Sequence, residues 1–146
     1  MSESIFDCSI FNLIKTSCLT ARLFDRKLSN NGIKLSQYHF LCLILEREKE
    51  NLISTIADRL GREKATIGKN MRILEKKGFI IIKKKQKKDN KANEKPRIEK
   101  IEITEAGIKA MSLSKEIYEN LSVSTKSGTL LESLKEFSTR IKKISA

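Results

Sequence analysis

The chain has 146 residues, of which 39% are hydrophobic and only 5% aromatic, and its net charge is +12. This length suits one domain with a real core, and the composition argues against a chain that is disordered throughout. Three cysteines and one histidine lack the paired spacing of a disulfide scaffold or a zinc site. The positive charge predicts a polyanionic partner, either nucleic acid or an anionic membrane surface.

The first predicted element is an amphipathic helix over about residues 5–30, which the polar residues and glycine at 30–32 end. A second helix is expected from Ser36, taken as its N-cap. Apolar residues cover more than one face of this helix, so we expect it to be deeply buried. A short helix follows, with Ser54 as N-cap and with Gly61 at the position where left-handed backbone is easiest.

Residues 62–78 predict a helix with two different faces. One side stacks Ile67, Met71 and Leu74 at helical spacing, which gives it to a core. The opposite side is basic, and the candidate DNA-binding residues of this helix are Lys64, Ala65, Thr66, Gly68, Lys69, Arg72 and Lys76. Such a face suits the DNA major groove, although an ordinary solvated cationic face is the alternative for this helix alone. The preceding short helix and tight turn favour a helix-turn-helix.

The charge is concentrated, because residues 62–100 hold fifteen cations and five anions. Residues 79–82 predict a buried strand, and the alternation around Ile101 and Ile103 predicts a half-buried one. The lysine-rich segment 83–100 would be a disordered tail or a localisation signal by itself, but pairing of its flanks makes it the tip of a hairpin. The candidate DNA contacts of this wing are Lys84, Lys87, Lys88, Asp89, Lys91 and Arg97. They would follow phosphates or enter the flanking minor groove.

A long helix is predicted after Thr104, with an interruption at residues 126–128. The last helix begins with the capping-box pattern of Thr129 and Glu132. Its apolar residues recur at helical spacing, at Leu130, Leu134, Phe137, Ile141 and Ile144. This seam packs either on the chain's own first helix or on a second chain. We favour the second chain, because it explains both terminal helices.

Five motifs carry a family resemblance: ARLFDRKL, LSQYHFLCLILER, IADRLG, KATIGKNMRILEKKGFI and ITEAG. Together they resemble the MarR (multiple antibiotic resistance regulator) family of winged-helix transcription factors over nearly the full length. The resemblance implies a mainly α fold with a small β-hairpin wing, as a single domain over residues 1–146. The winged helix-turn-helix would span 35–103, and dimerisation helices would span 5–30 and 105–146. It also implies a homodimer that reads DNA with the helix around Ala65 to Arg72.

The wing tip matches the family's Asp-x-Arg pattern in two ways. Asp89 with Lys91 fits by residue type, whereas Arg97 fits by counting back from Ile103. We favour Arg97 as the minor-groove residue, because its planar, weakly hydrated head suits a narrow groove. Arg62, Gly68 and other recognition-region residues depart from the usual pattern, so the preferred DNA sequence is not transferred.

A peroxide-sensing branch of this family carries a reactive cysteine near the start of the first helix. Cys8 lies close to that position, but no tyrosine stands nearby in sequence, so we favour an inert buried thiol over a redox sensor. His39 is expected to be a half-buried structural residue. The sequence has no nucleophile elbow, phosphate-binding glycine loop or metal-spaced carboxylates, so we expect no enzyme activity, no cofactor and no metal.

The predicted function is a sequence-specific regulator of transcription that binds double-stranded DNA. We expect a dimeric repressor, released by a small-molecule effector or by oxidation. An RNA-binding accessory protein is the main alternative, but the basic region lacks stacking aromatics. A membrane-surface role is third, because that region also lacks aromatic anchors. The acidic start and the short apolar run at residues 40–45 predict a cytoplasmic protein with no membrane partner.

Overall fold

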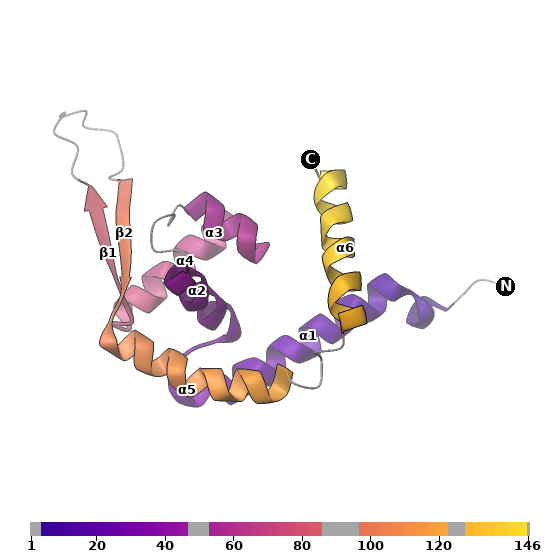
Figure 1. Cartoon of the computed structure of the whole chain (residues 1–146), viewed down its shortest axis with the longest axis horizontal. Helices are drawn as coiled ribbons and strands as arrows, with labels where there is room; N and C mark the ends of the chain where they lie inside the picture. The colour runs from indigo at the N-terminus through magenta and orange to yellow at the C-terminus, as the bar shows by residue number, and fades with distance from the viewer. Residues whose placement is uncertain (1–3, 47–52, 86–96, 123–127, 146) are drawn as a thin grey trace. The chain divides into compact units, whose positions relative to one another are not determined.

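The computed structural model describes residues 4–46, 53–85, 97–122 and 128–145 (Figure 1). The chain divides into two compact units, Met1–Ser114 and Lys115–Ala146. The elements in chain order are η1 (Ile5–Asp7), α1 (Ser9–Leu28), η2 (Ser29–Asn31), α2 (Leu35–Glu46), α3 (Ile53–Leu60), α4 (Lys64–Lys76), β1 (Ile80–Lys85), β2 (Arg97–Ile103), α5 (Glu105–Ser122) and α6 (Gly128–Ser145). The described part is mostly helical, and its sheet is one antiparallel hairpin, which confirms the predicted fold class.

The predicted first helix is divided into η1, α1 and η2. The backbone of Cys8 is extended and separates η1 from α1. The side-chain amide of Asn12 donates to the carbonyls of Phe6 at 2.6 Å and Cys8 at 3.0 Å, which satisfies acceptors on both sides of this junction. Gly32 ends η2 with a left-handed φ of 77°. The predicted stop was therefore right, whereas the unbroken helix was wrong.

The core of the first unit is built around α2. Phe40, Leu41 and Ile44 of this helix are almost wholly buried. The surrounding elements contribute Leu28, Ile33, Ile56, Ile67, Met71, Leu74, Ile80 and Ile101, which are also buried. The predicted deep burial of the second helix is confirmed. Each side chain of this kind stabilises the fold by about 1.5–3 kcal/mol relative to its exposed state.

Both predicted N-caps of these inner helices were wrong. Ser36 lies inside the first turn of α2, and Ser54 lies inside α3. The first N–H groups of α2 are satisfied by other side chains. The Asp25 carboxylate accepts from the Leu35 N–H at 2.8 Å, and the Gln37 side chain accepts from the Lys34 N–H at 3.0 Å. The cap therefore comes partly from α1, which local sequence does not indicate.

The turn between α3 and α4 lies at Gly61, whose φ is 61°. The N–H of the following Arg62 donates to the Ala57 carbonyl at 2.9 Å, which closes the end of α3. Helix α4 then spans Lys64–Lys76, within the predicted range 62–78. The helix-turn-helix predicted from the sequence is present, and α3, α4 and the hairpin all pack in the first unit (Figure 1).

The hairpin is longer than the sequence predicted. Strand β1 starts at Ile80 and continues to Lys85, so the first lysines of the basic segment lie in the strand and not at a tip. Ile80 pairs with Ile103 and Ile82 with Ile101, which aligns the apolar residues of both strands. The register shifts between Lys83, which pairs with Lys100, and Lys84, which pairs with Ile98. An irregularity of this kind is typical of a β-bulge.

The start of α5 is held closely against the end of α4. The Thr104 hydroxyl donates to the Gly78 carbonyl at 2.5 Å and accepts from the Gly107 N–H at 3.1 Å. Gly107 is buried, and a Cβ on it would lie 2.3 Å from the carbonyl oxygen of Phe79 and 2.8 Å from Cγ2 of Ile103. Only glycine fits without displacing the backbone at this crossing.

The second unit contains α6, and every side chain from 128 to 144 in this helix is exposed. The exposed apolar residues of its seam are Leu130, Leu134, Phe137, Ile141 and Ile144, at 36–80% exposure. In the first unit, α1 likewise exposes Ile10, Ile14 and Leu19 at 53–59%. Large apolar surfaces of this kind are typical of protein interfaces.

Candidate nucleic-acid interface

Helix α4 has the two faces that its sequence predicts. Ile67, Met71 and Leu74 are at most 2% exposed, so one face is fully committed to the core. The candidate DNA-binding residues lie on the other face, where Lys64, Ala65, Thr66, Lys69, Arg72 and Lys76 are exposed and Gly68 is half-buried. The core thus orients the helix, and the exposed face remains available to a ligand.

The exposed face of α4 forms a shallow hollow whose lining is mainly cationic. It has a volume of about 480 Å³ and is lined by Ala65, Lys69, Arg72, Ile73 and Lys76. Among the described residues, no carboxylate forms an ion pair with Lys69, Arg72 or Lys76. The lining combines a small residue and an apolar one with three cations, so an anionic partner can approach closely.

Arg72 is held in a defined orientation on this face. Its Nε donates to the Gly68 carbonyl at 3.3 Å, and its Nη2 lies 3.9 Å from the place where a Gly68 Cβ would be. The guanidinium therefore lies back along the helix toward its N-terminal half. With Nε engaged, the remaining N–H donors are those of Nη1 and Nη2, and these two nitrogens can form a bidentate contact with a planar acceptor pair.

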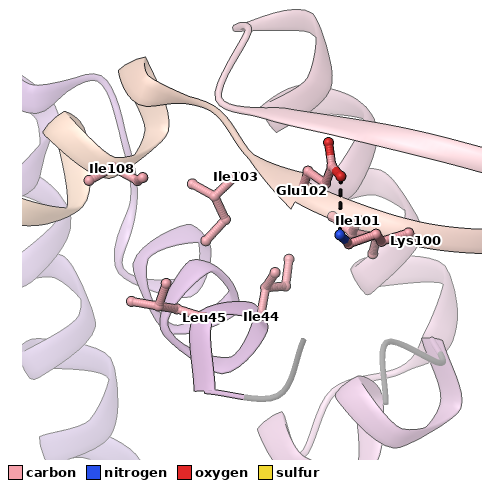
Figure 2. A pocket seen from close by; sticks show the side chains of 7 residues that line it. All are labelled: Ile44, Leu45, Lys100, Ile101, Glu102, Ile103 and Ile108. Atoms are coloured by element: carbon pink, nitrogen blue, oxygen red, sulfur yellow. Dashed lines mark ion pairs between the residues drawn. The ribbon is translucent and has the colours of Figure 1, made fainter. Parts of the chain in front are cut away.

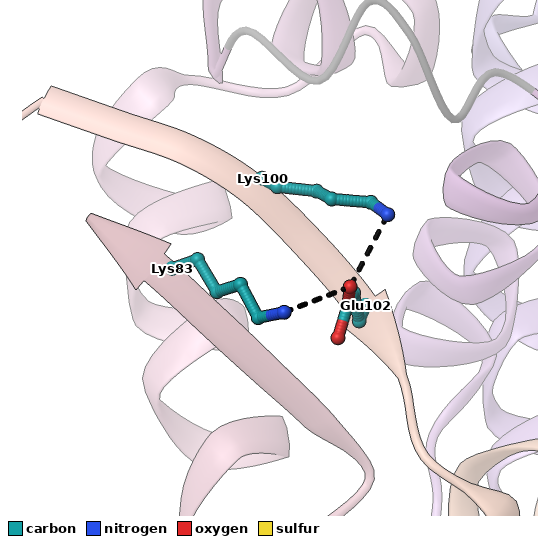
Figure 3. Close-up of polar contacts among 3 residues, drawn as sticks. All are labelled: Lys83, Lys100 and Glu102. Carbon is teal, nitrogen blue, oxygen red and sulfur yellow. Dashed lines mark hydrogen bonds and ion pairs between the residues drawn. The ribbon is translucent and has the colours of Figure 1, made fainter. Parts of the chain in front are cut away.

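The base of the hairpin carries a charged cluster, which we name the wing triad: Lys83, Lys100 and Glu102 (Figure 3). One carboxylate oxygen of Glu102 lies 3.1 Å from Nζ of Lys83 and 3.2 Å from Nζ of Lys100. Hydrogen bonds from Lys83 and then from Lys100 lower the pKa of Glu102. Sequence reasoning missed this cluster, although Lys100 and Glu102 are two residues apart and therefore share a face of a strand.

The predicted wing residues are only partly described. Lys84 is exposed on β1, where it pairs in register with Ile98. Arg97 begins β2 opposite Lys85. The remaining predicted contacts, Lys87, Lys88, Asp89 and Lys91, lie outside the described residues. The choice of Arg97 as the minor-groove residue stays a prediction.

Residues 33–92 match the model of the MarR family. These residues contain α2, the helix-turn-helix and β1. Over these residues the chain is similar to the MarR family. The resemblance seen in the sequence motifs is confirmed over this stretch.

Solved structures share the fold of this chain over nearly its full length. MosR of M. tuberculosis in complex with DNA is 16% identical, has a TM-score of 0.76, and the match covers 96% of this chain and 100% of that chain. MepR of S. aureus in complex with DNA is 22% identical with a TM-score of 0.73, over 98% and 100%. CouR of Rhodococcus jostii bound to p-coumaroyl-CoA is 17% identical with a TM-score of 0.74, over 96% and 95%. No curated protein sequence matches this chain.

The first unit also contains a pocket between α2, β2 and α5 (Figure 2). Its volume is about 290 Å³, and its lining residues are Ile44, Leu45, Lys100, Ile101, Glu102, Ile103 and Ile108. Aliphatic side chains form most of the wall, and the ion pair between Lys100 and Glu102 forms the polar part. The pocket arises where three elements meet, so sequence periodicity gave no signal for it.

His39 is half-buried, as predicted. Burial and then the charge of Arg62 lower its pKa below the ordinary value of 6.5. Arg62 lies in the turn before α4, and its positive charge disfavours a second positive charge on His39 of α2. A neutral imidazole is therefore favoured in the folded domain.

The expectation that Cys8 is a buried thiol was wrong. Cys8 is exposed, as is Cys18. The backbone N–H groups of Phe11 and then Ile10 lower the pKa of the Cys8 thiol, although its sulfur makes no capping hydrogen bond to α1. The residue stands at the N-terminal end of a helix, where core elements do not cover it. A lowered pKa favours the reactive thiolate.

Two further findings concern other classes of function. Across the described ranges, no cluster of three histidine, cysteine or carboxylate side chains has a geometry that would hold a metal ion. None of the described helices is both long and apolar enough to cross a membrane. The expected lack of enzyme activity remains a prediction.

Proposed function

We propose that this protein is a dimeric, sequence-specific transcriptional regulator that binds double-stranded DNA. The observation that carries this proposal is the geometry of α4. Its buried residues Ile67, Met71 and Leu74 fix the helix, while Lys69, Arg72 and Lys76 form an exposed cationic face. An α-helix fits the DNA major groove. One face of α4 therefore packs in the core while the opposite face contacts the bases and phosphates.

Different cations on this face have different roles in the proposal. Lys69 and Lys76 neutralise phosphates, because flexible ammonium groups follow the backbone and discriminate bases poorly. Arg72 is oriented by the Gly68 carbonyl at 3.3 Å and reads a base edge, with guanine as the preferred partner of a bidentate guanidinium. The wing, with Lys84 and Arg97, contacts the flanking backbone and minor groove.

The dimer is proposed from the apolar surfaces of the terminal helices. Leu130, Leu134 and Phe137 on α6 are 36–47% exposed, and Ile10 and Ile14 on α1 exceed 50%. Burying such side chains in a second copy would remove them from water and place two α4 helices in one particle. In this proposal residues 5–30 and 105–146 dimerise, and residues 35–103 bind DNA.

Repression and its release are the regulatory part of the proposal. A repressor blocks transcription while it occupies its operator, and two features of the chain offer a route to release. The pocket beside β2 can take a small, largely apolar effector, and CouR has been solved with p-coumaroyl-CoA bound. Cys8 offers oxidation as the second route, because its thiol is exposed and its pKa is lowered.

Selection of bound genomic DNA by the purified protein, followed by footprinting, tests this function. We expect a near-palindromic footprint whose half-site centres lie about 34–36 Å apart, one turn of DNA. The variants Lys69→Ala and Arg72→Ala should lose the footprint at concentrations where wild type protects it. An asymmetric footprint would argue against a dimeric reader. Equal competition by duplex RNA would instead support the RNA-binding alternative.

A further inference from the structure

We propose that Glu102 is a selectivity residue, which withholds Lys83 and Lys100 from DNA phosphates and so limits non-specific binding. This inference rests on the proposed DNA-binding function. It assigns to the wing triad a role opposite to that of the cations on α4, because a carboxylate on the hairpin is paired with two of the hairpin's lysines.

Strand register explains why one carboxylate reaches both lysines. Lys83 and Lys100 are directly opposite each other across the hairpin. Like charges in such a pair repel, and Glu102 follows Lys100 by two residues on the same face of β2. Its Oε1 atom receives both ammonium groups, at 3.1 Å and 3.2 Å (Figure 3). The triad therefore carries a net charge of one instead of two.

The triad is accessible to a polyanion. The side chains of Lys83 and Lys100 are 56% and 49% exposed, and that of Glu102 is 34% exposed. A phosphate that approaches this surface must displace a carboxylate that already engages both lysines, and it is repelled by that carboxylate until it does. On α4, by contrast, no described carboxylate pairs with Lys69, Arg72 or Lys76.

This difference favours specific over non-specific binding. Contacts from the wing base to phosphates carry no sequence information, and they would strengthen binding to every duplex alike. A protein with a net charge of +12 already has strong general attraction to DNA. Glu102 neutralises part of the charge at the base of the hairpin, while the cations of α4 stay unpaired with carboxylates of the described residues. This reduces the part of the DNA affinity that does not depend on sequence.

The simpler explanation is that Glu102 only stabilises the hairpin. Exposed ion pairs contribute little to stability, and the carboxylate would then have no effect on DNA beyond that of any surface charge. Glu136 provides the comparison, because its Oε1 lies 2.8 Å from Nη2 of Arg140 in an exposed pair on α6. The changes Glu102→Gln and Glu136→Gln alter net charge equally and each remove one exposed ion-pairing carboxylate.

The test measures affinity for the operator and for a scrambled duplex over a salt series. For Glu102→Gln we expect the slope of log affinity against log salt on scrambled DNA to steepen by about 1 to 2, since each cation contributes about 0.9. Affinity for scrambled DNA should rise about ten- to a hundredfold at 0.1 M salt, because a slope change of about 1 to 2 is multiplied by one decade of salt below 1 M. Affinity for the operator should rise less, and Glu136→Gln should match wild type in both measurements.

A double and a triple variant test whether the two lysines cause the steeper salt slope. Lys83→Gln with Lys100→Gln should barely change the slope when Glu102 is present, but should abolish the gain when combined with Glu102→Gln. The triple variant has no repelling pair, so its thermal unfolding also reports whether the hairpin stays intact. Equal slopes for Glu102→Gln and Glu136→Gln would overturn the inference alone. Absence of duplex binding by wild type would overturn the proposed function as well.

Discussion

The hydroxyl of Thr104 donates to the carbonyl of Gly78 at 2.5 Å, which joins the start of α5 to the segment that follows α4. The Thr104 N–H also donates to the Phe79 carbonyl at 3.0 Å. Thr104 thus donates hydrogen bonds to two consecutive carbonyls, those of Gly78 and Phe79. Because β1 begins at Ile80, this junction fixes where the hairpin leaves α4.

Gly107 is expected to be essential to this junction. Gly107→Ala should lower the free energy of unfolding by about 1–3 kcal/mol, as overpacking of a close crossing does. The added Cβ would lie 2.3 Å from the Phe79 carbonyl oxygen, and helix propensity recovers less than this cost. Urea denaturation measures the change. Gly128→Ala is the control, because nothing lies within 4 Å of its Cβ position; equal stability of both variants would contradict the prediction.

The dimer prediction is tested on α6. Changing Leu134 and Phe137 together to Glu should weaken association by at least about a hundredfold, since each apolar side chain contributes about 1.5–3 kcal/mol when buried. Sedimentation should then show monomer or unfolded protein. Thr139→Glu places a carboxylate on the opposite face of the same helix and should leave the dimer intact. A folded wild-type monomer at micromolar concentration would refute the interface.

Arg72 is expected to carry base preference, and charge alone should not replace it. Arg72→Ala should relax preference at one base pair by about 1–3 kcal/mol. Arg72→Lys keeps the charge but loses the planar fork, so it should relax preference at the same base pair while keeping the salt dependence. Lys69→Ala should weaken binding to all sequences alike. Binding to a panel of single-base operator variants measures these effects, and a Lys69→Ala profile with one altered position would reverse the assignment.

The wing is expected to contact phosphates through its lysines and the minor groove through Arg97. Neutralising Lys84, Lys87, Lys88 and Lys91 together should flatten the salt slope by up to about 3 to 4, because each phosphate contact contributes about 0.9. Sequence preference should survive. Arg97→Ala should instead reduce preference for A·T-rich flanks, whose narrow minor groove attracts arginine. An unchanged slope in the lysine variant would show that these residues do not contact phosphate.

His39 predicts a specific dependence of stability on pH. Its folded pKa is below 6.5, so the unfolded chain binds the proton first as pH falls. The stabilising contribution of the neutral imidazole is therefore complete above pH 6.5 and is lost as pH falls through the folded pKa. Urea midpoints measured from pH 7.5 to 5 should show this loss, and His39→Gln should remove it. Glu102→Gln should keep it, because the pKa of Glu102 is lowered from 4.5, below this window.

Periodicity in the sequence was sufficient for α4 and for the helix-turn-helix. Ile67, Met71 and Leu74 share a helix face whatever surrounds them, and Gly61 takes the left-handed backbone that its position in the motif predicts. These features depend on residues close together in the chain. The hairpin was predictable for the same reason, since alternation around Ile101 and Ile103 marks one buried face.

Tertiary structure decided the features that join distant residues. The cap of α2 comes from Asp25, whose carboxylate accepts from the N–H of Leu35 ten residues later. The wing triad depends on the register of β1 against β2, and the pocket depends on three elements that meet in the first unit. The exposure of Cys8 follows from which surfaces the core covers. Local sequence determines which residues share one face of a helix or strand. Only tertiary packing determines which other residues contact that face.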